Sequence, residues 1–479
     1  MTDAIRSTAL AGRWESDSRT RARRGRTARA VALAGAVAVA LPAPAAAQRG
    51  LPVVRDAEIE QLLRDYTTPI LRAAGLAKQN IRVIIINDRT FNAFVVDGQR
   101  IFVNVGALTE SKTPNQIIGV LAHETGHIAG GHLARLRDEL ANAQTAAIIA
   151  MLLGAGAMVA GAKSGSSAGG NVAAAAITAP QEMIRRSLLS YQRAQEESAD
   201  RAGVKFLTAT GQSPKGMYET FRRFADQMLV QAQRADPYLQ SHPMPSQRVA
   251  ALEALVKTNP NWDRKDPPEL QLRHDMVRAK LHGFLDRPDT VARRYPASDT
   301  SLPARYARAI SAYRFGDLRS ALAQIDGLIQ AQPGNPYFHE LKGQALVENG
   351  KAGEAIAPLR RAAALAPNAA LIRIMLAQAL IASGDKRHAE EAIGLLRTAM
   401  QREPDVPEAY GQLAIAYGRK GDLAQADLAS AQAALARGDV KTARELAARA
   451  KTRFATGTPG WVRADDITSM KLPRGPRRP

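Results

Sequence analysis

The chain has 479 residues, with 65 Lys plus Arg, 45 Asp plus Glu and no cysteine. A hydrophobic share of 46% excludes a wholly disordered chain, and the length suits about three domains of roughly 150 residues. Without cysteine there is no disulfide framework, thiol nucleophile or zinc–cysteine site, so any metal must be held by His, Asp or Glu. Aromatic residues make up only 5%, which is typical of Ala- and Leu-rich helices, so we expect an α+β chain that is mainly α-helical.

The formal net charge is +20, and residues 1–47 account for +5 of it because they hold eight Arg and three acidic residues. Outside the termini no run of Lys and Arg is interleaved with aromatic residues, as it would be on a nucleic-acid-binding surface. We therefore expect no nucleic-acid partner. The basic charge is interpreted as solvated helix surface, with contact to anionic lipid or acidic partners as the alternative.

Residues 1–47 are predicted to be a signal peptide. Residues 19–29 are cationic, residues 30–41 are apolar, and Ala45 and Ala47 fit an A-x-A cleavage site. The apolar stretch is too short to span a bilayer about 30 Å thick, so a cleaved signal is favoured over an uncleaved anchor. The mature chain is therefore expected in the bacterial periplasm, free or attached to an envelope membrane.

The next domain, residues 48–258, begins with a helical pattern and then a β pattern. Apolar residues recur at helical spacing over residues 56–76, which predicts an amphipathic helix. Residues 81–108 contain two β-branched runs separated by turn residues, which predicts two or three strands of a small antiparallel sheet. From Pro114 onwards the pattern is helical again.

Residues 140–176 form an Ala/Gly-rich insertion in this domain. Residues 140–162 carry no charge and are long enough for a transmembrane helix, but they are rich in Ala and Gly and include polar side chains. Residues 163–171 are a Gly/Ser-rich stretch. We expect a mobile lid or a helical hairpin that is buried or contacts the membrane, with membrane insertion and disorder as alternatives.

A Pro- and charge-rich stretch begins at residue 259, and residues 259–300 are expected to hold a linker and the first solenoid helices. A 34-residue period follows, with Gly at 316, 350 and 384, Pro at 333 and 367, Ala at 321, 355 and 389, and Ile or Leu at 325, 359 and 393. This spacing is typical of stacked helix pairs of the tetratricopeptide type. We predict such repeats over residues 301–456 and a basic tail over residues 457–479.

The sequence His123-Glu124-Thr125-Gly126-His127 is an H-E-x-x-H motif. On a helix, residues four apart lie on one face, so His123 and His127 can share a metal. Glu124 projects beside them, where its carboxylate can reach a water next to the metal. The alternative is a pair of core histidines that bind no metal.

A catalytic zinc takes three protein ligands, so the motif needs a third. The metzincin pattern H-E-x-x-H-x-x-G-x-x-H is not met, because Leu133 occupies the position of its third histidine. His132 comes one residue early and points to another side of the helix, so we expect it to pack or to orient a ligand. Glu196 and Asp200 are four apart and share a helix face, so Glu196 could ligate a metal while Asp200 orients a ligand histidine. A plain acidic helix surface is the alternative.

Four segments together resemble a known family: HETGH at 123–127, EESAD at 196–200, SHPMPSQR at 241–248 and NAFVVDG at 92–98. They are similar to the zinc metallopeptidases of the HtpX/CAAX-endopeptidase type. The signal peptide and the repeats narrow the resemblance to the periplasmic BepA/YfgC-like branch. The Ala/Gly-rich insertion and the irregular last repeats depart from the pattern, so substrate access and the docking partner stay open.

The resemblance implies a gluzincin fold with one Zn²⁺ per chain. The residues it assigns are the zinc ligands His123, His127 and Glu196, the general acid and base Glu124, and the supporting residues Asp200 and Arg248. It also implies proteolytic quality control and assembly of outer-membrane β-barrel proteins. Unfolded or misassembled outer-membrane proteins would be the substrates, and the repeat array would dock on the outer-membrane assembly machinery.

Two further segments are candidates for a role at the site. His242 precedes Pro243 on a constrained turn, where its imidazole could donate to an oxyanion, occupy the fourth metal position, or be a plain turn residue. The strand beginning with Asn92, Ala93 and Phe94 could offer an edge to which an extended substrate adds. Two other functions remain open: a non-proteolytic chaperone or adaptor with a latent or structural metal, and an integral-membrane protease that uses residues 140–162.

Overall fold

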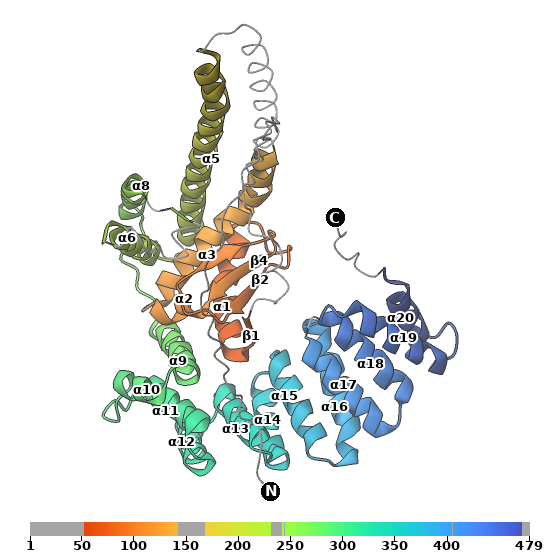
Figure 1. The fold of residues 1–479 in the computed structure, drawn as a ribbon. Coiled ribbons are helices and arrows are strands. Elements are labelled where there is room, and N and C mark those ends of the chain that lie inside the picture. The colour runs from red at the N-terminus through yellow and green to blue at the C-terminus, as the bar shows by residue number, and fades with distance from the viewer. Residues whose placement is uncertain (1–51, 142–167, 231–241, 244, 405, 472–479) are drawn as a thin grey trace, which may run out of the picture. The chain divides into compact units, whose positions relative to one another are not determined.

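The structure, a computed structural model, describes residues 52–141, 168–230, 242–243, 245–404 and 406–471 (Figure 1). The predicted signal peptide and residues 142–167 of the Ala/Gly-rich insertion lie outside the described residues. Within the described ranges, no helix has the length and apolar character needed to cross a membrane. The expected α+β class, mainly α, is confirmed.

A small mixed sheet lies at the start of the described chain, with strands β1 (Val53–Val54), β2 (Arg82–Ile86), β3 (Ala93–Val95) and β4 (Arg100–Asn104) in the order β1-β2-β4-β3. Both edge pairs are antiparallel, but the central pair β2 and β4 is parallel, with Arg82 opposite Arg100. The prediction of an antiparallel sheet is therefore wrong for the central pair. The hairpin between β3 and β4 turns at Gly98, whose φ of 75° suits glycine, and this hairpin brings β4 back beside β2 in the same direction.

Helix α1 (Ala57–Ala73) begins where the sequence predicts it. The carboxylate of Asp56 accepts hydrogen bonds of 3.0 Å from the backbone N–H groups of Glu58 and Ile59, so it caps the helix. Its apolar stripe is buried in the main core together with β2, β4 and helices α2 (Val105–Glu110) and α3 (Pro114–Ala129). The stripe consists of Ile59, Leu62, Leu63, Tyr66 and Ile70.

Helix α3 is nearly surrounded by protein. It packs against α5 (Ala168–Ala209) and α6 (Lys215–Val230), and α6 and α5 also contact α8 (Ser246–Lys257). Gly119 permits the contact with α6, because a Cβ there would lie 2.5 Å from Met217 Cβ. This packing holds residues 123–127 of α3 against residues 196–200 of α5.

The remaining helices form a repeat array that confirms the tetratricopeptide-like prediction (Figure 1). They are α9 (Pro268–Leu285), α10 (Pro288–Arg294), α11 (Leu302–Phe315), α12 (Leu318–Ala331), α13 (Pro336–Glu348), α14 (Ala352–Leu365), α15 (Ala370–Ala382), the 3₁₀ turn η2 (Lys386–His388), α16 (Ala389–Arg402), α17 (Pro407–Lys420), α18 (Leu423–Ala436), α19 (Val440–Arg453) and α20 (Pro459–Ser469). The 34-residue period has a physical basis, since its Ala and Ile or Leu positions, such as Ala321, Ala355 and Ile325, are buried between helices.

Helix α20 corrects the expected C-terminal tail. Residues 459–469 are helical and pack against α19, with Ala464 and Ile467 buried in the last core cluster. Thr458 caps the start of this helix, because its hydroxyl accepts a hydrogen bond from the N–H of Trp461. The helical stack therefore continues past the predicted boundary at residue 456.

Helix α9 belongs to two cores at once. Its Val277 and Leu281 are buried in the core that contains α1, α3 and the sheet, whereas its Met276 is buried with Tyr306 and Phe338 of the repeats. The apolar contacts of this one helix thus join the region that contains the sheet to the array.

A buried charged cluster lies at the same junction. Lys280 Nζ lies 2.7 Å from Asp56 Oδ2 and 3.2 Å from Glu58 Oε2, and the Tyr306 hydroxyl donates to Glu58 at 2.9 Å. Glu340 is only 6% exposed, and its Oε2 has no hydrogen-bond partner among the described residues. Burial raises the pKa of Glu340 to about 8; attraction to Lys280 opposes the shift, and repulsion from Asp56 and Glu58 adds to it. One ammonium cannot balance three ionised carboxylates here, so Glu340 keeps its proton.

Glu340 is expected to make stability depend on pH. Between its ordinary pKa and about 8, the folded chain holds a proton that the unfolded chain has released, so the free energy of unfolding falls as pH rises through this range. Glu340→Gln mimics the neutral side chain and should gain stability relative to the wild type from pH 5 to pH 9. Denaturant unfolding of both proteins across this range measures the difference.

The matched control is Glu354→Gln, because Glu354 pairs with Lys351 on an exposed surface. Its difference from the wild type should stay flat over the same pH range. A flat difference for Glu340→Gln as well would contradict the protonated assignment.

Candidate metal centre and active site

The H-E-x-x-H motif lies on α3 as predicted, in its last two turns. His123 is fully buried and Glu124 is 1% exposed, whereas His127 is partly exposed. The Nε2 atoms of the two histidines lie 3.1 Å apart, so both rings face the same point. The helix therefore brings together the two imidazoles that the spacing predicted.

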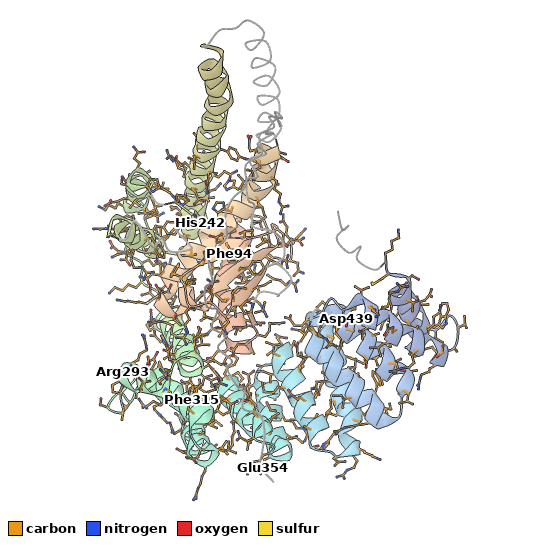
Figure 2. The ribbon with its side chains drawn as sticks, in the orientation of Figure 1. Phe94, His242, Arg293, Phe315, Glu354 and Asp439 are labelled. Atoms are coloured by element: carbon orange, nitrogen blue, oxygen red, sulfur yellow. The ribbon has the colours of Figure 1, made fainter. Side chains whose placement is uncertain are left out.

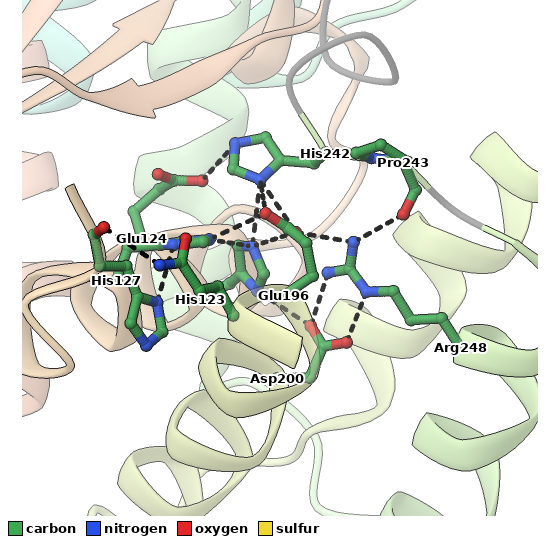
Figure 3. A network of polar contacts seen from close by, with 10 residues as sticks. His123, Glu124, His127, Glu196, Asp200, His242, Pro243 and Arg248 are labelled. Atoms are coloured by element: carbon green, nitrogen blue, oxygen red, sulfur yellow. Dashed lines mark hydrogen bonds and ion pairs between the residues drawn. The ribbon is translucent and has the colours of Figure 1, made fainter. Parts of the chain in front are cut away.

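Helix α5 supplies the carboxylate that the motif lacked. One oxygen of Glu196 lies 3.4 Å from His123 Nε2, and the other lies 3.4 Å from His127 Nε2. His242 joins the group from the segment before α8, with its Nδ1 3.1 Å from both Glu196 oxygens and 3.4 Å from His123 Nε2 (Figure 3). The ligand atoms of these four residues all lie within 4.8 Å of one another.

The chemistry of these donors fits a metal cation. Burial lowers the pKa of His127 to about 3, so its ring is neutral and offers a lone pair. Burial alone would also lower the pKa of His123, but hydrogen bonds to Asp200 and Glu196 raise it to about 9. Burial would raise the pKa of Glu196, yet His242 and the two motif histidines hold it well below its usual range. Two imidazoles and an ionised carboxylate that converge in a buried site form a donor set that suits zinc, and binding the metal would displace the proton that His123 shares with Glu196.

Asp200 and Arg248 support the ligands. Asp200 Oδ1 lies 2.9 Å from His123 Nδ1, and Arg248 binds Asp200 through Nε at 2.7 Å and Nη2 at 2.8 Å. Arg248 Nη1 lies 2.7 Å from Glu196 and donates to the Pro243 carbonyl at 3.0 Å (Figure 3). Burial would raise the pKa of Asp200, but the Arg248 guanidinium lowers it. One guanidinium thus fixes both carboxylates and the residue next to His242.

Glu124 differs from the other carboxylates of the site. Neither of its oxygens has a hydrogen-bond partner among the residues described, and the nearest ion-pairing group is His242 Nε2 at 3.5 Å from Oε1. Burial raises the pKa of Glu124, while His242 and His123 oppose the rise. A carboxyl group in this setting can accept a proton and release it again.

The strand predicted to bind substrate has mostly inward-facing side chains. Ala93 is fully buried, Phe94 stacks on Phe102 with 5.3 Å between ring centroids, and Asn92 Oδ1 is buried without a partner in the described part of the chain. Because the side chain of Ala93 is buried, only its backbone could take part in the predicted strand addition. Strand β3, on which Figure 2 labels Phe94, is nevertheless an edge of the sheet and packs against α3.

Sequence reasoning missed two features of the site. The ion pair between Arg248 and Glu196 joins residues with no periodic relation, so no local pattern could predict it. The role of Gly126 had a visible signal, because glycine inside a helix is unfavourable without a packing reason. A Cβ on Gly126 would lie 2.7 Å from Ala199 O, so the glycine lets α3 and α5 approach closely.

The fold and this site define a metalloendopeptidase. Residues 54–256 match the family described as Peptidase family M48, and residues 306–370 match a tetratricopeptide repeat. The chain thus carries an M48 peptidase domain followed by repeats, which confirms the predicted enzyme class and the family resemblance.

Particular relatives extend the comparison. The β-barrel assembly-enhancing protease of Escherichia coli K12 is 25% identical over 354 residues, covering 71% of this chain and 68% of that protein. The protein of the same name from Yersinia pestis is 23% identical over 434 residues, covering 86% of this chain and 83% of that protein. The mitochondrial metalloendopeptidase OMA1 of Schizosaccharomyces pombe is 25% identical over 185 residues, covering 38% and 49%.

Gly126→Ala is expected to damage the site through packing alone. The added methyl group would overlap Ala199 O, which forces α3 and α5 apart and costs about 1–3 kcal/mol of stability. Thermal unfolding and metal titration of the purified variant measure the loss of stability and of metal affinity.

Gly394→Ala is the matched control. Gly394 lies in the middle of α16 with no described atom within 4 Å of an added Cβ, so alanine there should stabilise the helix by about 0.5–1 kcal/mol. Equal behaviour of the two variants would refute the close-approach argument.

Proposed function

We propose that this chain is a zinc-dependent endopeptidase of the bacterial envelope that acts in quality control and assembly of outer-membrane β-barrel proteins. The observation that carries the proposal is the convergence of His123, His127 and Glu196 on one point. The carboxylate of Glu124 lies beside them and has no hydrogen bond to any described residue. The names of the E. coli and Yersinia relatives and the tetratricopeptide repeats support the outer-membrane role.

One zinc ion per chain would be held by His123, His127 and Glu196. When bound, zinc acts as a Lewis acid that polarises the scissile carbonyl and acidifies water. Glu124 accepts the proton of the attacking water and then donates it to the leaving amine, a return step that its raised pKa assists. Asp200 holds the Nδ1 proton of His123 and so fixes the tautomer that presents Nε2 as a ligand.

Substrate binding is proposed at the edge of the sheet. The backbone of residues 92–94, at and before the start of strand β3, can add an extended peptide as a further strand, which reads main-chain groups more than side chains. This mode suits unfolded β-barrel precursors, whose segments themselves form strands. The repeats would bind the outer-membrane assembly machinery, and a contact with the membrane surface would keep the enzyme close to its substrates.

His242 is proposed to regulate the site. Its Nδ1 lies within hydrogen-bond distance of Glu196 and close to His123, inside the ligand group. This position favours the first of two roles for His242: a fourth metal ligand that keeps the enzyme latent. An oxyanion donor, the other role, would point at the substrate instead. It also gives some support to the second candidate function, a chaperone or adaptor with a closed metal site.

The export route rests on residues 1–47. Their cationic and apolar segments support a signal peptide, and hence an enzyme of the periplasm, free or associated with the outer membrane.

Glu124→Gln is expected to lower cleavage of an unfolded β-barrel outer-membrane protein by at least about 100-fold, because the proton acceptor is lost. The assay uses the zinc-loaded mature chain, and the zinc content of the variant should stay unchanged. Glu197→Gln is the control, since Glu197 pairs with Arg201 on the surface and should cleave normally. Normal cleavage by Glu124→Gln would show that another group is the base, and no cleavage by the wild type would favour the adaptor.

His242→Ala is expected to raise the rate of peptide cleavage several-fold, because it opens the fourth position. His339→Ala, on an exposed part of α13, should leave the rate unchanged. A large loss of activity in His242→Ala would instead support the oxyanion role, and an unchanged rate would reject both roles.

A further inference from the structure

His132 lies just beyond the motif helix, next to a proposed metal ligand. Its Nδ1 is 3.0 Å from Nδ1 of His127, and the two rings meet edge to face. The residue is only 4% exposed, so this contact is shielded from solvent. Nδ1 of His132 thus faces Nδ1 of His127, the ring nitrogen that is not directed at the proposed metal.

The valence of the imidazole fixes the direction of this hydrogen bond. If Nε2 of a neutral His127 presents its lone pair to a metal, the ring must carry its proton on Nδ1. Two nitrogens 3.0 Å apart need one donor and one acceptor, so Nδ1 of His132 is the acceptor and its own proton is on Nε2.

The surroundings of His132 hold its ring in this orientation. A Cβ on Gly130 would lie 2.2 Å from His132 Nε2 and 2.6 Å from its Cδ2, so only glycine at position 130 leaves space for the ring. Gln195 donates a hydrogen bond of 3.2 Å to the His132 carbonyl, and Gln195 directly precedes Glu196. The ring and backbone of His132 are therefore both fitted to the metal site.

We propose that His132 is a positioning residue for the metal: it accepts the Nδ1 proton of His127 and holds that ring as a ligand. The inference rests on the metal site of the proposed function. The two motif histidines then have different hydrogen-bond acceptors at Nδ1. The acceptor for His123 is the ionised carboxylate of Asp200, and the acceptor for His127 is the neutral imidazole of His132. A neutral acceptor also avoids a further buried negative charge beside Glu124 and Glu196.

The test compares His132→Leu with His132→Asn in the full mature chain. Leucine keeps the apolar bulk but offers no acceptor, whereas the Asn oxygen can replace the ring Nδ1 in geometry and chemistry. Zinc affinity is measured by competition with a chromophoric chelator, and thermal unfolding of the metal-free proteins reports on packing. We expect His132→Leu to bind zinc about 10–100-fold more weakly than the wild type and His132→Asn to recover most of the loss.

Equal zinc affinity in the Leu variant and the wild type would overturn the inference. So would an equal loss in the Leu and Asn variants that matches their loss of metal-free stability, since that pattern indicates packing alone. A wild-type chain that binds no zinc would overturn the proposed metal site, and this inference with it. If His132→Leu does not fold, Gly130→Ala serves instead, because the added methyl group would push the His132 ring out of its position. Unchanged zinc affinity in that variant would likewise overturn the inference.

Discussion

Helix α3 meets helix α5 with the backbone of Ala199 seated against Gly126, and this short interhelical distance governs the whole site. Because the helices are this close, a glutamate on α5 can touch both histidines of α3. A wider spacing would leave the imidazoles and the carboxylate as separate buried polar groups, each with an uncompensated desolvation cost. The proposed role of Glu124 as proton acceptor depends on a ligand group that is assembled in this way.

In the site, the positive charge of Arg248 compensates the buried negative charges of Glu196 and Asp200. Glu196 and Asp200 are both nearly buried, and Arg248 contacts each of them, so their ionised forms are retained inside the protein. The same guanidinium donates to the carbonyl of Pro243, the residue after His242, so the group that supports Glu196 and Asp200 also holds the segment that carries His242. Charge balance and the placement of His242 therefore depend on one side chain.

Much of this architecture could be predicted from local patterns. The H-E-x-x-H spacing, the i to i+4 relation of Glu196 and Asp200 and the 34-residue period each follow from helix geometry, which sequence displays directly. The parallel pairing of β2 with β4 depends on where a hairpin folds back, so it had no local signal. Helix α20 did have one, because Thr458 and Pro459 are typical of a helix start, but its place in the stack depends on the apolar surface of α19. The contact of Arg248 with Glu196 is likewise a product of tertiary packing.

Helix α9 contributes side chains to two hydrophobic cores. Val277 and Leu281 on this helix complete the core around the sheet, and Met276 completes the first layer of the array. A fragment that ends at residue 258 would expose the apolar core surface that α9 covers. It would also lack Lys280, the ion-pair partner of Glu58. The peptidase domain is therefore not an independent module, because a helix next to the repeats completes both its apolar core and its buried charge pair.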